Sequence, residues 1–123
     1  MADVLVVDDD DVIRETLLEL LEGNYQCQVA STAEDALQKL EAQPFDVVVT
    51  DVSLPGLSGG ELLAKVRELY PETPVIIVSG LSDQEQAHSL KSLGAFDYLL
   101  KPFRLEMVEE SVKRAVEHRQ DKK

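Results

Sequence analysis

Several short apolar segments of the sequence end in residues that could take part in chemistry. These residues are Asp8, Asp9, Asp51, Ser79 and Lys101. Carboxylates bind hard cations such as Mg²⁺ and can also attack phosphorus to form an aspartyl phosphate. Lysine and serine side chains bind phosphoryl oxygens, by charge and by hydrogen bonding respectively. Together these residue types predict a phosphoryl-transfer site, if the fold brings them to one place.

The three acids among them predict a cation site. Two carboxylates about 5 Å apart repel each other by roughly 3 kcal/mol at an effective dielectric constant near 20. Such a cluster either binds a cation or raises a pKa, and a set of oxygen ligands favours Mg²⁺. We expect Asp9 and Asp51 to be direct ligands and Asp8 to hold a metal-bound water. The backbone carbonyl of Ser53 is a candidate for a further ligand.

Asp51 is the candidate nucleophile. It follows the apolar segment 47–50 and precedes a Pro-Gly turn, so its carboxylate is presented on a rigid support. Mg²⁺ would offset the repulsion between this carboxylate and a phosphate. Lys101 would hold one phosphoryl oxygen, and the Ser79 hydroxyl with nearby backbone N–H groups would hold the others.

Helix capping is the competing interpretation of the acidic run Asp8-Asp9-Asp10-Asp11. Asp is favoured at the N-cap and in the first turn of a helix. We expect Asp10 and Asp11 to serve only this purpose. For Asp8 and Asp9 the cation site is favoured, because two acids directly after a buried strand are costly without a ligand.

Strand and helix patterns alternate along the whole chain. The β-rich segments are continuous apolar runs, which is typical of parallel strands covered on both faces. They are residues 4–7, 47–49, 75–78 and 98–100, and a weaker fifth strand is expected around residues 27–30. Helical periodicity marks residues 13–21, 33–40 after a Thr32 cap, 62–69, 82–93 and 105–116. The fourth helix, 82–93, has few apolar residues, which indicates either a solvated edge helix or an element that moves or binds a partner.

This order predicts an α/β fold with a single doubly wound, five-stranded parallel sheet of strand order 2-1-3-4-5, flavodoxin-like. Sites in such sheets form beyond the carboxyl ends of the strands, where the strand order reverses. The length of 123 residues predicts one domain over 1–123, with 118–123 as a candidate linker or tail.

Composition narrows the functional classes. The chain has 24 acidic and 12 basic side chains and a net charge of -12, so its surface would repel nucleic acids and anionic membranes. Cys27 is the only cysteine, which suits a reducing cytoplasm. No segment has the pattern of a signal peptide or the apolar length of a membrane span. We therefore expect a cytoplasmic location, no membrane contact and no direct nucleic acid binding by this chain.

Four motifs in this order resemble the receiver domains of bacterial two-component response regulators. They are Val6-Val7-Asp8-Asp9-Asp10, Val49-Thr50-Asp51-Val52-Ser53-Leu54-Pro55-Gly56, Val78-Ser79-Gly80, and Gly94-Ala95-Phe96-Asp97-Tyr98-Leu99-Leu100-Lys101-Pro102-Phe103. The resemblance implies that Asp51 is the phosphoacceptor and that Asp8 and Asp9 are the acidic pair of the Mg²⁺ site. It implies that Ser79 and Tyr98 form a switch pair, in which the rotamer of Tyr98 is coupled to the hydroxyl of Ser79. It also implies that Lys101 binds phosphate and that the peptide bond from Lys101 to Pro102 is cis.

The implied reaction is phosphoryl transfer to Asp51 from a phosphohistidine of a histidine kinase or a phosphotransfer protein. Such a domain is a switch that assists its own phosphorylation and dephosphorylation, rather than an enzyme. Phosphorylation would change the conformation of the face formed by residues 82–93, 98–100 and 105–116, and this face would then bind a partner or form a homodimer. Lys91 and Asp97 could take part in that dimer, whereas Ser111 stands where many DNA-binding members carry Arg.

Two alternatives remain at this point. The pattern Asp8-x-Asp10-x-Val12 resembles the opening motif of haloacid-dehalogenase-type phosphatases, with Asp8 as nucleophile and Asp10 as acid. The second alternative is a receiver-like module that is never phosphorylated and acts by protein contacts alone. It is disfavoured because such modules commonly lack one of the acids or the lysine, and this chain has them all.

Overall fold

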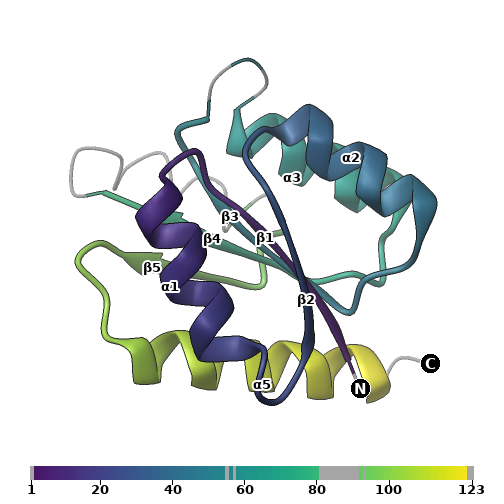
Figure 1. The fold of residues 1–123 in the computed structure, drawn as a ribbon. Helices are drawn as coiled ribbons and strands as arrows, with labels where there is room; N and C mark the ends of the chain where they lie inside the picture. Colours follow the sequence, from purple (N-terminus) through teal and green to yellow (C-terminus); the bar gives the residue numbers. More distant parts are fainter. Residues whose placement is uncertain (1, 55, 57, 81–91, 93, 122–123) are drawn as a thin grey trace.

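A parallel sheet of five strands forms the centre of the protein in the computed structural model, which describes residues 2–54, 56, 58–80, 92 and 94–121 (Figure 1). The strand order is β2-β1-β3-β4-β5, which confirms the predicted topology. The strands are β1 (Asp3–Val7), β2 (Gln26–Ala30), β3 (Val47–Asp51), β4 (Val75–Ser79) and β5 (Asp97–Leu100).

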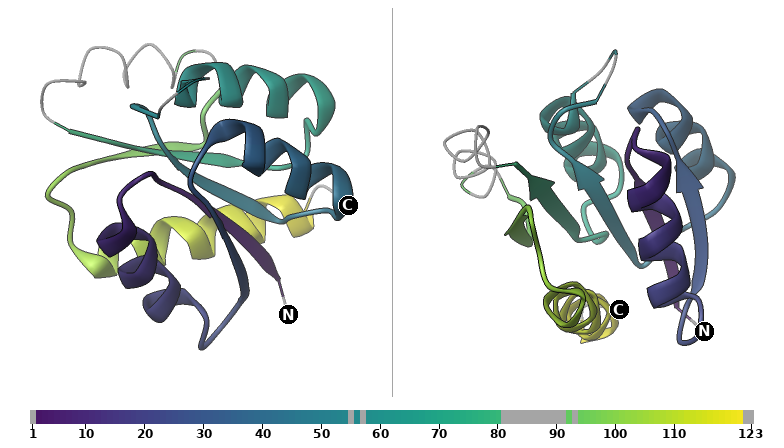
Figure 2. Two further views of the ribbon diagram at one scale, coloured as in Figure 1. Left: turned by 45° about the horizontal axis from the view of Figure 1, so that its top comes forward. Right: turned by 60° about the vertical axis from the view of Figure 1, so that its left-hand side comes forward.

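The described helices cover both faces of this sheet (Figures 1 and 2). One face carries α2 and α3, and the other carries α1 and α5. The bounds are α1 (Asp11–Leu21), α2 (Ala33–Ala42), α3 (Gly59–Leu69) and α5 (Leu105–Asp121). Of the helix predicted near 82–93, residues 82–91 and 93 lie outside the described part of the chain. Residues 118–121, part of the predicted linker or tail, belong to α5.

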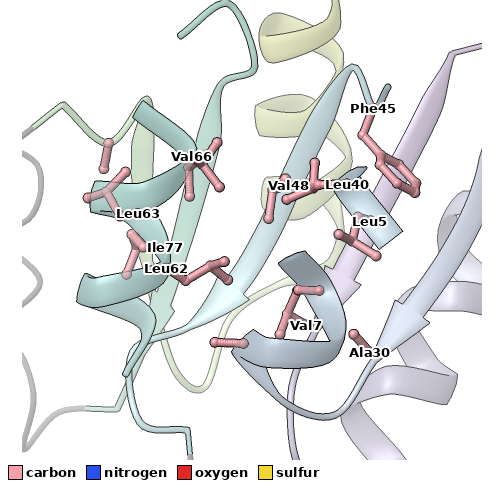
Figure 3. Close-up of a cluster of buried hydrophobic side chains, with 14 of the residues drawn as sticks. Leu5, Val7, Ala30, Leu40, Phe45, Val48, Leu62, Leu63, Val66 and Ile77 are labelled. Carbon is pink, nitrogen blue, oxygen red and sulfur yellow. The ribbon is translucent and has the colours of Figure 1, made fainter. Parts of the chain in front are cut away.

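Successive residues of a strand point to opposite faces of the sheet, which explains the continuous apolar runs. In β1, Leu5 and Val7 pack under α2 and α3, whereas Val4 and Val6 pack under α1 and α5. Figure 3 shows the first of these two clusters, in which Phe45 lies beside Leu5. A strand buried on both faces holds its carboxyl end rigidly, and the candidate site lies at these ends.

Side-chain caps set where the helices begin. Asp10 accepts hydrogen bonds from two backbone N–H groups of α1, and Thr32 accepts one from the first turn of α2. Both caps were predicted from the sequence. Ser58 and Glu61 form a reciprocal capping box at α3, which follows the Ser-x-x-Glu pattern. None of the described helices combines the length and the apolar character that crossing a membrane requires.

Candidate functional site

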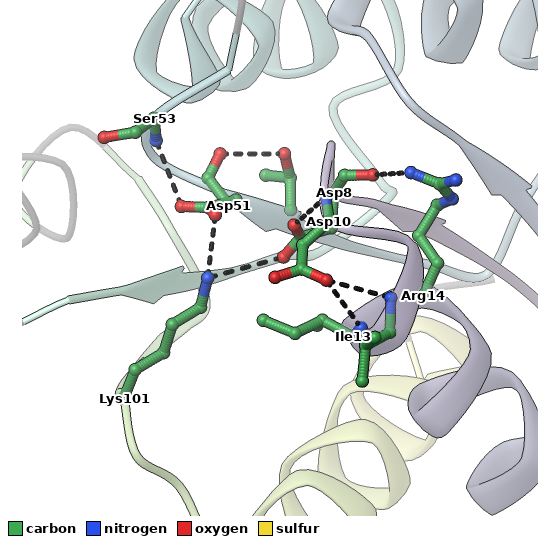
Figure 4. Close-up of polar contacts among 9 residues, drawn as sticks. Asp8, Asp10, Ile13, Arg14, Asp51, Ser53 and Lys101 are labelled. Atoms are coloured by element: carbon green, nitrogen blue, oxygen red, sulfur yellow. Dashed lines mark hydrogen bonds and ion pairs between the residues drawn. The ribbon is translucent and has the colours of Figure 1, made fainter.

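The predicted site residues meet at the carboxyl edge of the sheet. Asp8 directly follows β1, Asp51 ends β3, Ser79 ends β4, and Lys101 directly follows β5. These four strands are neighbours in the order β1-β3-β4-β5, so their ends lie side by side. In Figure 4 the carboxylates of Asp8 and Asp51 and the amine of Lys101 point toward one another.

Three carboxylates form one compact cluster. Oxygens of Asp8, Asp9 and Asp51 all lie within 4.8 Å of one another. Asp8 and Asp51 are buried, with 2% and 6% of their surface exposed, whereas Asp9 is exposed. Burial raises the pKa of Asp8, opposed by the N–H of Asp10 and the charge of Lys101. The charges of Asp51 and Asp9 raise the pKa of Asp8 further. The cluster therefore has unfavourable charge that a cation would relieve.

The Asp51 carboxylate is held on both of its oxygens. Oδ1 accepts a hydrogen bond from the N–H of Ser53 at 3.1 Å, and Oδ2 accepts one from Nζ of Lys101 at 2.8 Å. The Thr50 hydroxyl donates to the backbone carbonyl of Asp51 at 3.1 Å. These contacts orient the candidate nucleophile before any ligand arrives. The role of the Ser53 carbonyl as a metal ligand stays a prediction.

Lys101 lies between two acids. Its Nζ is 2.8 Å from Oδ2 of Asp51 and 3.5 Å from Oδ2 of Asp8. Burial acts to lower the pKa of Lys101, but the hydrogen bond to Asp51 and the charges of the two acids outweigh it, so this pKa is raised. Lys101 is therefore a cation at neutral pH. Its peptide bond to Pro102 is cis.

Ser79 is fully buried, and its Oγ has no hydrogen-bond partner among the described residues. A buried hydroxyl left unpaired costs about 1–3 kcal/mol, so such an atom at a site edge indicates a ligand that supplies the partner. The backbone carbonyl of Ser79 accepts the N–H of Lys101 at 2.7 Å, which ties the two strand ends together. Ser79 and Lys101 therefore lie at neighbouring strand ends of the same sheet edge.

The predicted switch pair lies on neighbouring strands. Tyr98 of β5 is half-buried, pairs in register with Ile77 of β4 and packs against the cluster under α2 and α3. Ser79 is two residues further along β4, opposite Leu100. This arrangement places the two side chains near the same edge, whereas their coupling stays a prediction.

Asp97 makes contacts within its own chain. Its Oδ2 accepts hydrogen bonds from the Ser111 hydroxyl at 2.8 Å and from Arg114 at 3.1 Å. Ser111 is therefore an internal partner of Asp97, at the position where the resemblance led us to look for an intermolecular arginine. Lys91, the other residue considered for a dimer, lies outside the described residues.

The remaining acids of the run serve the start of α1, as predicted. Asp10 is the N-cap, and Asp11 forms an ion pair with Arg14. The carboxylate of Asp10 is engaged by two backbone N–H groups of α1, so capping explains its position, which argues against the phosphatase alternative. Sequence reasoning missed Arg14, whose Nη1 donates to the backbone carbonyl of Asp8 at 2.7 Å. The only sequence signal for it was its i,i+3 spacing from Asp11.

The donor set fits a magnesium ion. Mg²⁺ prefers oxygen ligands and usually takes one or two carboxylates together with waters and phosphate oxygens. Asp8, Asp9 and Asp51 supply carboxylate oxygens within 4.8 Å of one another, at a partly open edge of the sheet. These three residues are the ones that would hold the ion.

Comparison with known proteins agrees with this geometry. Residues 4–113 match the family model described as the response regulator receiver domain. The DNA-binding transcriptional regulator NtrC of Escherichia coli K12 is 38% identical over 119 residues, which cover 96% of this chain and 25% of that regulator. The response regulator protein FleR of Pseudomonas aeruginosa is 39% identical over 103 residues, covering 83% of this chain and 22% of FleR.

Solved structures share the whole fold. A CheY-like response regulator receiver domain protein from Methanospirillum hungatei JF-1 has a TM-score of 0.93 and 30% identity, covering 100% of this chain and 99% of that one. A receiver domain protein from Clostridium thermocellum has a TM-score of 0.92 and 30% identity, covering 98% of both chains.

Fold and site define a doubly wound α/β protein with an acidic cluster at the point where the strand order reverses. The chain belongs to the response regulator receiver domain family. Receiver domains are phospho-accepting switch domains of two-component systems and interact with histidine kinases. The chain spans about a quarter of the length of the curated relatives it matches.

Proposed function

We propose that the Asp51 carboxylate accepts a phosphoryl group from a phosphohistidine of a histidine kinase or a phosphotransfer protein. This proposal rests on one observation, which is that three features suited to phosphoryl transfer lie together at the carboxyl edge of the sheet. They are a carboxylate held by a lysine at 2.8 Å, an acidic cluster suited to Mg²⁺, and the buried, unpartnered hydroxyl of Ser79.

In the proposed reaction, an Asp51 oxygen attacks phosphorus and the bond between phosphorus and the histidine nitrogen breaks. The nitrogen takes the electron pair, and an aspartyl phosphate forms. When bound by Asp8, Asp9 and Asp51, Mg²⁺ would supply positive charge that offsets the repulsion between carboxylate and phosphoryl group. Later attack of water on phosphorus releases inorganic phosphate and restores the carboxylate, so the chain acts as a resettable switch rather than an enzyme.

The chain's own residues would receive the new phosphoryl oxygens. Lys101 already lies 2.8 Å from Oδ2 of Asp51 and would neutralise one phosphoryl oxygen. The Ser79 hydroxyl would donate to another, and in doing so gain the hydrogen bond that it lacks among the described residues. The charge added at Asp51 would then draw Ser79 and Tyr98 into a second arrangement.

The proposed output surface comprises β5 and α5, together with the segment 82–93 predicted from the sequence, of which residues 82–91 and 93 lie outside the described residues. Partner binding or homodimerisation there would follow phosphorylation. Asp97 is engaged by Ser111 and Arg114 of its own chain, which favours a dimer contact that does not depend on an arginine at position 111. The net charge of -12 disfavours direct nucleic acid binding by this chain, so any DNA binding in the proposed signalling role would belong to another domain or a partner.

Incubation with acetyl phosphate and MgCl₂, followed by intact mass measurement, tests the proposal. The wild type should gain one phosphoryl mass, and the gain should disappear with EDTA or in Asp51→Asn. Asp35→Asn, which removes a carboxylate from α2 instead, should leave the gain unchanged.

Beryllofluoride, a phosphate mimic, separates the alternatives if acetyl phosphate gives no adduct. Binding of the mimic with Mg²⁺ would show that the site is intact and only the donor is unsuitable. Failure of both reagents on a folded wild type would refute the proposal in favour of a receiver-like binding module.

A further inference from the structure

Arg14 reaches back from α1 to the peptide that joins Asp8 to Asp9 (Figure 4). Its Nη1 donates to the Asp8 carbonyl at 2.7 Å, and its Nη2 pairs with the Asp11 carboxylate. Only 18% of the Arg14 side chain is exposed. The guanidinium is therefore fixed at two points beside the acidic turn, and its planar fork suits this double contact.

The two neighbouring acids of the turn are held in different ways. The Asp8 carboxylate accepts the N–H of Asp10 at 2.9 Å and lies 3.5 Å from Nζ of Lys101. The Asp9 carboxylate is exposed and forms no hydrogen bond or ion pair with a described residue. The place of the Asp9 carboxylate therefore depends on its backbone rather than on contacts of its own.

Arg14 acts on that backbone. The carbonyl of Asp8 lies in the same peptide plane as the nitrogen and Cα of Asp9. A hydrogen bond to this carbonyl therefore limits rotation of the plane and, with it, the direction of the Asp9 side chain. The N–H of Asp8 is bonded to the Ala30 carbonyl at 3.1 Å, so Arg14 completes the anchoring of the turn on its outer side.

We propose that Arg14 is a positioning residue of the cation site, which keeps the Asp9 carboxylate beside Asp8 and Asp51. This inference rests on the proposed function, because it assumes that the acidic cluster binds Mg²⁺. If Arg14 positions Asp9, its removal should weaken Mg²⁺ binding, whereas an argument from charge alone predicts tighter binding. A guanidinium near the cluster repels a cation, so its removal would tighten Mg²⁺ binding if electrostatics decided the outcome.

A MgCl₂ titration followed by backbone amide NMR distinguishes the two predictions. Arg14→Met removes the hydrogen bonds and the charge but keeps an apolar stem. We expect its Kd for Mg²⁺ to rise about tenfold, the lower end of the range for residues that orient metal ligands. Arg14→Lys, which retains one cationic donor, should recover part of the loss. Lys65→Gln removes one positive charge from an exposed position of α3 and is the matched control, with affinity at or slightly above that of the wild type.

A second readout separates positioning from a general loss of structure. In acetyl phosphate reactions, Arg14→Met should need about tenfold more Mg²⁺ for half-maximal rate, yet approach the wild-type rate when Mg²⁺ is saturating. Asp11→Asn keeps the bond from Arg14 to Asp8 and should change the Kd by no more than about threefold. Thermal unfolding and amide shift dispersion show whether each variant is folded.

Three results would decide against the inference. The first is an Arg14→Met variant that is folded and binds Mg²⁺ as tightly as the wild type or more tightly. The second is an Asp11→Asn variant that loses as much affinity as Arg14→Met, which would place the effect in the ion pair. The third is an Arg14→Lys variant with no recovery. A wild type that binds no Mg²⁺ would instead refute the proposed function itself.

Discussion

Asp9→Asn should stabilise the protein in the absence of metal, although it removes a residue of the proposed site. Oxygens of Asp9, Asp8 and Asp51 lie within 4.8 Å of one another, and no described residue forms a hydrogen bond or ion pair with the Asp9 carboxylate. The substitution therefore removes repulsion without removing a contact. The Asp9 carboxylate would therefore lower the stability of the metal-free protein while helping it to bind Mg²⁺.

The distance sets the size of the effect. Two unit charges 4.8 Å apart repel by about 0.9 kcal/mol in water and by about 3.5 kcal/mol at an effective dielectric constant of 20. The lower value suits Asp9 because its side chain is exposed, and its two neighbours together contribute about 2 kcal/mol. Attraction to Lys101 offsets part of this repulsion. We expect a net gain of about 1 kcal/mol, which corresponds to a rise in Tm of roughly 3–5 °C for a domain of this size.

Urea unfolding in EDTA, followed by circular dichroism, measures the gain. It should be largest at low salt and shrink at high salt, because exposed charges are screened. Glu41→Gln in α2 makes the same change in net charge away from the cluster and should gain less than about 0.5 kcal/mol. With MgCl₂ at ten times the wild-type Kd, the stability difference should shrink, because the wild type gains about 1.4 kcal/mol and the variant, which binds the ion more weakly, gains less.

The reasoning fails if Asp9→Asn is no more stable than the wild type in EDTA at low salt. It also fails if Glu41→Gln shows the same gain, because the effect would then reflect overall charge rather than the cluster. An equal response of wild type and Asp9→Asn to Mg²⁺ would show that Asp9 is not a ligand.

Three further predictions follow from burial and pairing. Burial raises the pKa of Asp8 above its ordinary value of 3.8, so the native state takes up a proton on Asp8 at a higher pH than the unfolded state does. Lowering the pH from neutral to between these two pKa values should therefore raise the free energy of unfolding of the wild type. Urea unfolding should show a smaller rise for Asp8→Asn, which lacks this carboxyl group. Burial raises the pKa of the Cys27 thiol to about 11. Its alkylation by iodoacetamide at pH 8 should therefore be about a hundredfold slower in the native protein than in urea, and equal rates would contradict this. Asp46→Ala removes the acceptor for Arg119 at 3.1 Å and for the N–H of Asp3 at 2.8 Å, and it should lower the free energy of unfolding by about 1–3 kcal/mol. An unchanged urea midpoint would show that these contacts contribute nothing.

Much of the fold could be predicted because its signals are local. Strands covered on both faces must be apolar at every position, so the runs 4–7, 47–49 and 75–78 identified the three buried strands β1, β3 and β4. The caps at Asp10 and Thr32 depend on groups two or three residues away, and the sequence shows such spacings directly. Parallel strands with alternating helices then brought the carboxyl ends together, which placed Asp8, Asp51, Ser79 and Lys101 at one edge.

Other features depended on how side chains from distant elements pack. Arg119 pairs with Asp46 across 73 positions of the chain, and no periodicity in the sequence indicates this contact. Ser111 bonds to Asp97 because α5 lies against β5, although its identity alone indicated only a departure from a family pattern.

At the site, the sequence alone determined which chemical groups were available and at which strand ends they lie, since strand burial and chain order set both. Tertiary structure decided how these groups are paired. Lys101 lies between Asp51 and Asp8, the Ser79 hydroxyl is buried without a described partner, and Arg14 bonds to the carbonyl of Asp8. The physical reason is that hydrogen bonds and charge pairs act over about 3–4 Å, so they depend on the final position of each side chain, which a residue pattern does not specify.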